Sequence, residues 1–77
     1  MGKPTKITNS IRALRFARGE MTQAQLAQRI GVTRQTIIAI EQGRYSPSLE
    51  MAFQIARVFN VPLDQVFQYP DGEGPTR

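Results

Sequence analysis

The chain has 77 residues, of which 40% are hydrophobic, and this length suits one small domain with a single core rather than a catalytic cleft between two domains. It contains neither cysteine nor histidine, which excludes disulfides, the usual zinc sites and the commonest catalytic base. The net charge is +4: residues 1–45 carry eight Lys or Arg against two Glu, whereas residues 46–77 carry two Arg against four acids, so the first part is expected to face a polyanion.

Apolar residues recur mostly at the spacing of helices, and no stretch shows the sustained alternation that is typical of strands. Apolar residues at three- and four-residue spacing predict a first helix over Thr8–Arg18, ended by Gly19. Thr22 is followed three residues later by Gln25, which is the spacing of a capping box. This spacing predicts a second helix over Gln23–Ile30.

A very short turn separates the second helix from the third. Gly31 suits a left-handed turn, and Thr33 is a good N-cap for a third helix over Arg34–Gln42. A connection of two or three residues forces the two helices to cross at a steep angle.

The rest of the chain predicts two further helices. Ser48 is a cap for a fourth helix over Leu49–Phe59, and a short fifth helix is expected over Leu63–Gln68. Two segments outside the helical bundle, Lys6–Thr8 and Phe67–Tyr69, are candidates for short paired strands.

The organisation expected from composition is a single domain with two short flanking segments. Residues 1–6 are predicted to form a flexible basic arm, residues 7–69 the domain, and the Pro/Gly-rich residues 70–77 a mobile tail. No apolar run approaches the length of a membrane helix, and the start of the chain lacks the apolar segment of a secretory signal, so a cytoplasmic protein is expected.

Residues 23–42, "QAQLAQRIGVTRQTIIAIEQ", resemble the helix-turn-helix of the XRE family, which contains the lambdoid phage repressors and Cro. The motif positions that match are Leu26, Ala27, Ile30, Gly31, Val32, Ile37 and Ile40. The similarity extends over roughly residues 8–69. It implies an all-α, compact, five-helix, lambda-repressor-like DNA-binding domain in which the second and third helices form the helix-turn-helix.

The resemblance implies that the first turn of the third helix enters the major groove of double-stranded DNA. Arg34 could pair with guanine and Gln35 with adenine, each by two hydrogen bonds. Ile38 and Ala39 could offer only apolar contacts, for example to a thymine methyl group. These four residues are the predicted base contacts.

The same resemblance predicts contacts with the phosphate backbone on both sides of the third helix. Gln23 starts the second helix, where free backbone amides favour an anion, and Thr22 caps that helix. Thr33, Arg44 and Tyr45 flank the third helix where the duplex backbone is expected to run. The alternative for Gln23 and Arg44 is a surface residue without a ligand. For Thr22 and Thr33 it is the helix cap alone. For Tyr45 it is packing of the ring under the loop.

Family members commonly pair an arginine of the first helix with a glutamate near the end of the third, which implies a structural ion pair between Arg15 and Glu41. The match at Arg15 needs one extra residue in the turn "GEM", because without it Phe16 falls at that position.

The C-terminal part of the domain has more apolar residues than one core-facing stripe needs. Six residues of the fourth helix suffice for the core: Leu49, Ala52, Phe53, Ile55, Ala56 and Phe59. Because dimerisation is common in the family, the remaining apolar residues are predicted to form a homodimer interface, namely Met51, Val58, Val66, Phe67 and Tyr69.

The function that the resemblance implies is a sequence-specific transcriptional regulator, acting as a repressor that binds a palindromic operator as a homodimer. A DNA-binding antitoxin paired with a toxin is the main alternative, and a protein-interaction module with the same fold is another. An enzyme is disfavoured because the carboxylates, lysines and serines form no recognisable spaced set. No cofactor, metal or small-molecule ligand is expected.

Overall fold

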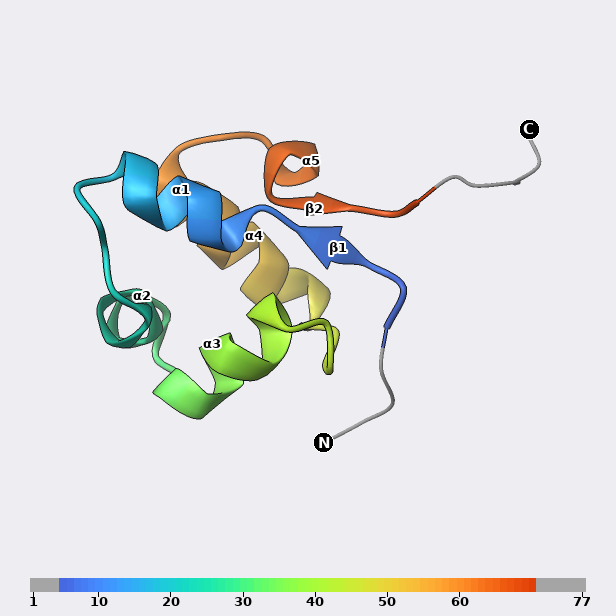
Figure 1. Cartoon of the computed structure of the whole chain (residues 1–77), viewed down its shortest axis with the longest axis horizontal. Helices are drawn as coiled ribbons and strands as arrows, with labels where there is room; N and C mark the ends of the chain where they lie inside the picture. Colours follow the sequence, from blue (N-terminus) through green and yellow to red (C-terminus); the bar gives the residue numbers. More distant parts are fainter. Residues whose placement is uncertain (1–4, 71–77) are drawn as a thin grey trace.

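The computed structural model describes residues 5–70, which form a small helical bundle with a two-stranded ribbon at one edge (Figure 1). The elements are, in chain order, β1 (Thr8–Asn9), α1 (Ile11–Ala17), α2 (Gln23–Ile30), α3 (Arg34–Glu41), α4 (Leu49–Phe59), α5 (Leu63–Val66) and β2 (Phe67–Gln68). The all-α, five-helix prediction is confirmed. Most of the predicted arm (residues 1–6) and tail (residues 70–77) lies outside the described residues.

The two short strands correct the bounds predicted for the first and fifth helices. Thr8 pairs with Gln68 and Asn9 with Phe67 in an antiparallel ribbon, so α1 begins three residues later than predicted and α5 ends two residues earlier. The amide of Ser10 then donates to the carbonyl of Val66 over 2.8 Å. The ribbon ties the start of the domain to its end (Figure 1).

Side-chain caps set the starts of three helices. At α2, the Gln25 amide donates to Thr22 Oγ1 (3.0 Å) and the Thr22 amide donates to Gln25 Oε1 (2.8 Å), which completes a capping box. Thr33 and Ser48 accept from the third residue of α3 and α4 in the same way. These caps explain why the starts of α2, α3 and α4 agree with the sequence prediction.

One apolar core joins all five helices. The residues whose side chains are fully buried come from each of them: Ile11, Leu26, Ile37, Ile40, Ile55, Phe59 and Val66. Burying each such side chain stabilises the fold by roughly 1.5–3 kcal/mol relative to leaving it in water. Val66 is 0% exposed, so its predicted role in a dimer interface is wrong.

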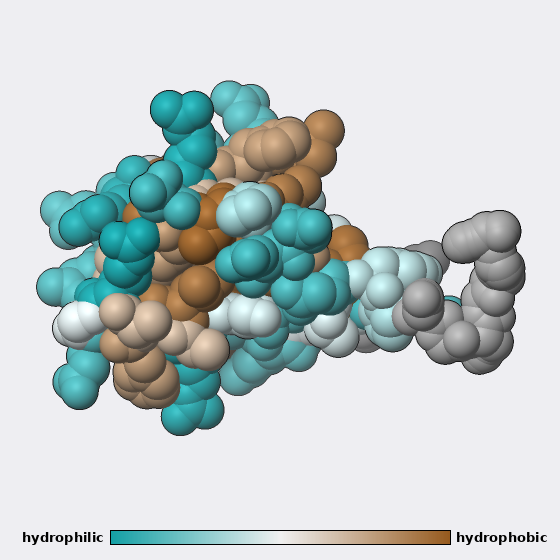
Figure 2. Space-filling model, turned by 90° about the horizontal axis from the view of Figure 1, so that it is seen from above, coloured by the Kyte–Doolittle hydropathy of each residue, from teal (hydrophilic) through white to brown (hydrophobic). Residues whose placement is uncertain are grey.

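The outer face of α4 also differs from the prediction. Leu49 and Phe53, expected in the core, are 68% and 49% exposed, whereas Met51 and Val58, expected at the surface, are partly buried against the core. The two pairs flank opposite sides of the buried stripe, so helical periodicity alone does not tell which side other elements cover. Hydrophobic residues accordingly reach the surface between hydrophilic ones in Figure 2.

Candidate nucleic-acid interface

The first turn of α3 is a polar tip on a helix that is anchored in the core. Gly31 ends α2 at φ +77°, and the chain enters α3 through Thr33, whose hydroxyl accepts from the Thr36 amide. Arg34 and Gln35 follow the cap and are both exposed. The tip therefore presents one guanidinium and one carboxamide to the outside.

Two other predicted base contacts lie further along α3. Ile38 is half-buried and retains some accessible surface. Ala39 is only 3% exposed, so its methyl group offers almost no surface to a base, and the expectation of a base contact there is corrected. Longer neighbouring side chains easily cover a single methyl group. The loop after α3 also folds back onto this part of the helix, where the Arg44 amide donates to the Ala39 carbonyl (3.0 Å).

The start of α2 adjoins this tip. Thr22 is exposed, and its hydroxyl is already used as the helix cap. Gln23 is half-buried, and its Nε2 donates to Glu41 Oε1 over 3.2 Å. The Glu41 carboxylate favours the orientation of the Gln23 side-chain amide in which its nitrogen points toward Glu41. Gln23 is therefore held in one rotamer, and its second N–H remains available for another acceptor.

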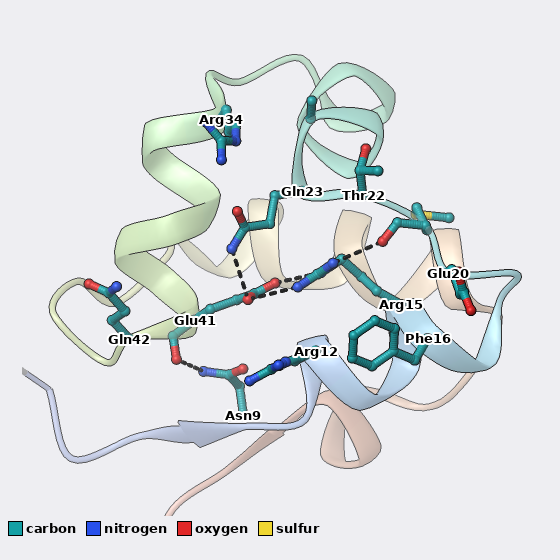
Figure 3. Close-up of a pocket in the computed structure, with 12 residues that line it drawn as sticks. Asn9, Arg12, Arg15, Phe16, Glu20, Thr22, Gln23, Arg34, Glu41 and Gln42 are labelled. Carbon is teal, nitrogen blue, oxygen red and sulfur yellow. Dashed lines mark hydrogen bonds and ion pairs between the residues drawn. The ribbon is translucent and has the colours of Figure 1, made fainter.

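Arg15 and Glu41 form the ion pair implied by the resemblance, with side chains only 9% and 10% exposed. Arg15 Nε donates to Glu41 Oε2 (2.7 Å) and Nη2 donates to Oε1 (3.1 Å), while Nη1 donates to the Met21 carbonyl (2.9 Å). Figure 3 shows this network between α1, α3 and the start of α2. The guanidinium nitrogens of Arg15 and both carboxylate oxygens of Glu41 are hydrogen-bonded. A buried ion pair is tolerated under this condition.

The turn between α1 and α2, in which the family match at Arg15 was expected to need one extra residue, has an unusual backbone. Gly19 and Glu20 both adopt the left-handed conformation, with φ of +74° and +61°. Two such residues in succession reverse the chain sharply, and the Met21 amide then donates to the Arg15 carbonyl over 2.9 Å.

Asn9 is a residue of this region that the sequence reasoning missed. Its Nδ2 donates to the carbonyl of Ile40 (3.0 Å) at the end of α3, and its Oδ1 accepts from the amide of Ile11 (3.1 Å) at the start of α1. One side chain thus satisfies a free carbonyl of one helix and a free amide of another. An asparagine two residues before a helix was the available signal.

The loop after α3 carries the other predicted backbone contacts. Arg44 is exposed, and Tyr45 is half-buried against the core. The Thr5 amide donates to the Gly43 carbonyl over 3.2 Å, so the N-terminal segment lies against the same loop.

A cleft of about 690 Å³ lies between α1, the start of α2 and α3 (Figure 3). Arg12, Gln23 and Arg34 line it together. The Arg12 guanidinium carbon lies 5.5 Å from the ring centroid of Phe16, which is 52% exposed. Sequence reasoning did not single out this pair, although arginine and an aromatic four residues apart on a helix face each other.

Residues 5–70 lack two further kinds of site. This part of the chain contains no cluster of three or more acidic side chains placed to hold a metal ion. It also contains no helix long and apolar enough to cross a membrane.

A compact helical domain in which a sharp turn joins two helices, the second with an exposed polar tip, belongs to the helix-turn-helix class of DNA-binding domains. Residues 11–66 match the model of the helix-turn-helix family HTH_3. The chain belongs to this XRE-type family.

Several curated relatives are named as regulators. An uncharacterized HTH-type transcriptional regulator of Methanocaldococcus jannaschii is 55% identical over 53 residues, covering 69% of this chain and 80% of the relative. The regulator YgzD of Bacillus subtilis is 44% identical over 59 residues, covering 77% of this chain and 88% of the relative. The cryptic phage CTXphi transcriptional repressor RstR of Vibrio cholerae is 36% identical over 59 residues, covering 77% of this chain and 52% of the repressor.

A solved structure with the same fold is described as a "putative DNA-binding protein from Bacteroides fragilis". It superimposes with a TM-score of 0.70 at 27% identity, covering 80% of this chain and 98% of that one. The chain is therefore a DNA-binding transcriptional regulator of the helix-turn-helix type and does not belong to an enzyme family.

Proposed function

We propose that the chain represses transcription by binding a specific operator in the major groove, with Arg34 and Gln35 reading base edges. The observation that carries the proposal is the exposed guanidinium and carboxamide in the first turn of α3, on a helix whose other face is buried. These groups match the edges of guanine and adenine in the major groove, and each good pair discriminates between bases by roughly 1–3 kcal/mol. Ile38 adds an apolar contact from the next turn.

Contacts with the DNA backbone on either side fix the register of α3 on the duplex. Gln23 donates its remaining N–H to one phosphate, beside Thr22 and the first amides of α2. On the other side, Thr33 and the loop residues Arg44 and Tyr45 meet the opposite strand. The support for the first side is that Thr22 and Gln23 line one cleft with Arg34 and that Glu41 orients Gln23. The support for the other side is the exposure of Thr33 and Arg44.

A homodimer is the second part of the proposal, with an interface centred on Leu49 and Phe53. These two side chains lie four residues apart on one face of α4 and are among the most exposed large hydrophobics of the described chain. Leu49 also lines an apolar groove of about 280 Å³ with Leu63 and Phe67. Tyr69, just beyond β2, is a further large hydrophobic residue that is 68% exposed. Two copies facing each other would remove the patch from water.

A dimer would present two copies of α3 about 34 Å apart, so the operator should be a near-palindrome read in successive major grooves. Occupancy of such an operator would by itself block transcription. The similarity to a phage transcriptional repressor supports repression rather than activation. Such a regulator would act on the chromosome in the cytoplasm.

The test of sequence reading is selection of bound duplexes from a random DNA pool, carried out with the purified wild type and with Arg34→Ala and Gln35→Ala. We expect enrichment of an inverted repeat with half-sites about one helical turn apart, and loss of one base preference in each variant. Absence of any enriched sequence would overturn the proposal.

The test of assembly is the mass in solution at about tens of micromolar, an order of magnitude at which such a dimer should be populated. We expect a dimer for the wild type and for Gln54→Glu, an exposed control on α4, and a monomer for Phe53→Glu. A monomeric wild type contradicts the homodimer. A wild type that is recovered only with a second chain from its native operon would instead support the antitoxin alternative.

A further inference from the structure

We propose that Arg12, held against the ring of Phe16, binds a backbone phosphate of the operator, so that α1 forms part of the DNA-binding surface. The inference rests on the proposed function, because it assigns another contact to the same duplex.

The location of Arg12 is the first argument. Arg12 lines the same cleft as Gln23 at the start of α2 and Arg34 in the first turn of α3, and Figure 3 shows the three side chains around one opening. A duplex that reaches both Gln23 and Arg34 must lie across the mouth of this cleft. Its backbone therefore passes close to α1.

The charge balance of the cleft is the second argument. Its lining includes the arginines Arg12, Arg15 and Arg34 and the glutamates Glu20 and Glu41, which leaves an excess of positive charge. Both oxygens of Glu41 are engaged, because Arg15 and Gln23 donate to them. Arg15–Glu41 is the one ion pair within residues 5–70, so Arg12 has no carboxylate partner there.

The aromatic ring beside Arg12 is the third argument. The ring centroid of Phe16 lies 5.5 Å from the guanidinium carbon of Arg12 and 5.8 Å from that of Arg15, so two like charges gather around one ring. Glu41 compensates Arg15 but not Arg12. A phosphate on Arg12 would supply the missing counter-charge, and the ring limits the positions that the guanidinium samples before binding.

The chemistry of the side chain fits this ligand. A guanidinium can donate two parallel N–H bonds to two phosphate oxygens, and it can do so while one of its faces rests on an aromatic ring. Phe16 contributes little to the core, since it is 52% exposed. The contact with Arg12 therefore explains the position of Phe16 better than packing in the core does.

The experiment measures binding of the selected operator duplex over a range of salt concentrations, for the wild type, Arg12→Ala and Arg12→Gln. The matched control is Arg57→Ala, which removes an equal charge from an exposed site on α4 outside the cleft. We expect both Arg12 variants to lose about tenfold in affinity and about 0.9 in the slope of log K against log salt per bound subunit. Base preferences should be unchanged, because the contact carries no sequence information.

Phe16→Leu should give a smaller loss in the same direction, because the charge remains and only its support is removed. Thermal unfolding of each variant verifies that the fold is retained. If the wild type selects an operator and Arg12→Ala binds it with the slope and affinity of Arg57→Ala, the inference falls while the proposed function stands. If the wild type selects no sequence, both fall.

Discussion

The two ends of α3 differ sharply in how they are held. Its N-terminal end carries the exposed residues Arg34 and Gln35. This end is held by the side chain of Thr33, which caps the helix. Its C-terminal end is bound to three other segments: Glu41 accepts from Arg15 of α1 and Gln23 of α2, and Asn9 donates to the carbonyl of Ile40. One end has free polar groups, and the other end has almost none.

This difference shows how a helix of eight residues can hold exposed polar side chains in a fixed place. The position of the tip is set at the far end of the helix and along its buried face, where Ile37 and Ile40 enter the core. Polar groups at the tip then need no partner within the protein and stay available for a ligand. The two ends should therefore respond differently to substitution, in stability at one end and in DNA recognition at the other.

The largest effect is expected at the anchored end. Glu41→Ala removes one partner of a buried ion pair and leaves Arg15 without a counter-charge, so the free energy of unfolding should fall by about 3–5 kcal/mol. Chemical denaturation measures this loss. Glu50→Ala, which removes an exposed acid from α4, is the matched control and should change stability by less than about 1 kcal/mol.

The same variant also tests whether the C-terminal end of α3 contributes to stability only and the N-terminal end to base recognition. In any Glu41→Ala protein that remains folded, the ranking of preferred bases should persist, because Arg34 and Gln35 are intact. A variant of wild-type stability with altered base preference would contradict the structural role of the ion pair.

An intermediate effect is expected at the free end. Arg34→Ala should leave the free energy of unfolding within about 0.5 kcal/mol of the wild type, since the side chain is exposed and makes no ion pair among the described residues. Discrimination at one base pair should fall by about 1–3 kcal/mol. Competition binding with operators changed at single positions measures this. Equal loss at every position would instead indicate a phosphate contact.

Much of this comparison could be predicted from the sequence, because the signals are local. The capping-box spacing at Thr22, the N-cap Thr33, the turn at Gly31 and the helical periodicity predicted α2 and α3 almost to the residue. The Arg15–Glu41 pair was predicted from family resemblance rather than from local pattern, and it is present in the structure.

The features that the sequence did not predict depend on tertiary contacts. Leu49 and Met51 are both apolar and both flank the buried stripe of α4, so only the packing decides which one is exposed. Ala39 was expected to contact a base from the family resemblance, yet its single methyl is covered in the structure. The sequence offered Lys6–Thr8 and Phe67–Tyr69 as candidate strands and also placed Phe67 and Gln68 in the fifth helix. The pairing of Asn9 with Phe67 and of Thr8 with Gln68 confirms short terminal strands and ends α5 at Val66.

The smallest effect is expected at Thr33, whose side chain both caps α3 and is predicted to contact a phosphate. Thr33 Oγ1 accepts from the Thr36 amide over 3.2 Å, so Thr33→Ala should lower the free energy of unfolding by about 1 kcal/mol through loss of the cap. Thr33→Asp keeps a capping oxygen and adds a negative charge at the positive end of the helix, so stability should remain near that of the wild type.

The two variants separate capping from phosphate binding because they change the two properties in different combinations. If a phosphate lies beside Thr33, the aspartate variant should bind the operator more weakly than the alanine variant, although it is the more stable protein. Binding and thermal unfolding of both proteins in one buffer give the comparison. If affinity instead follows stability across the pair, Thr33 acts on DNA binding only by holding the first turn of α3 in place.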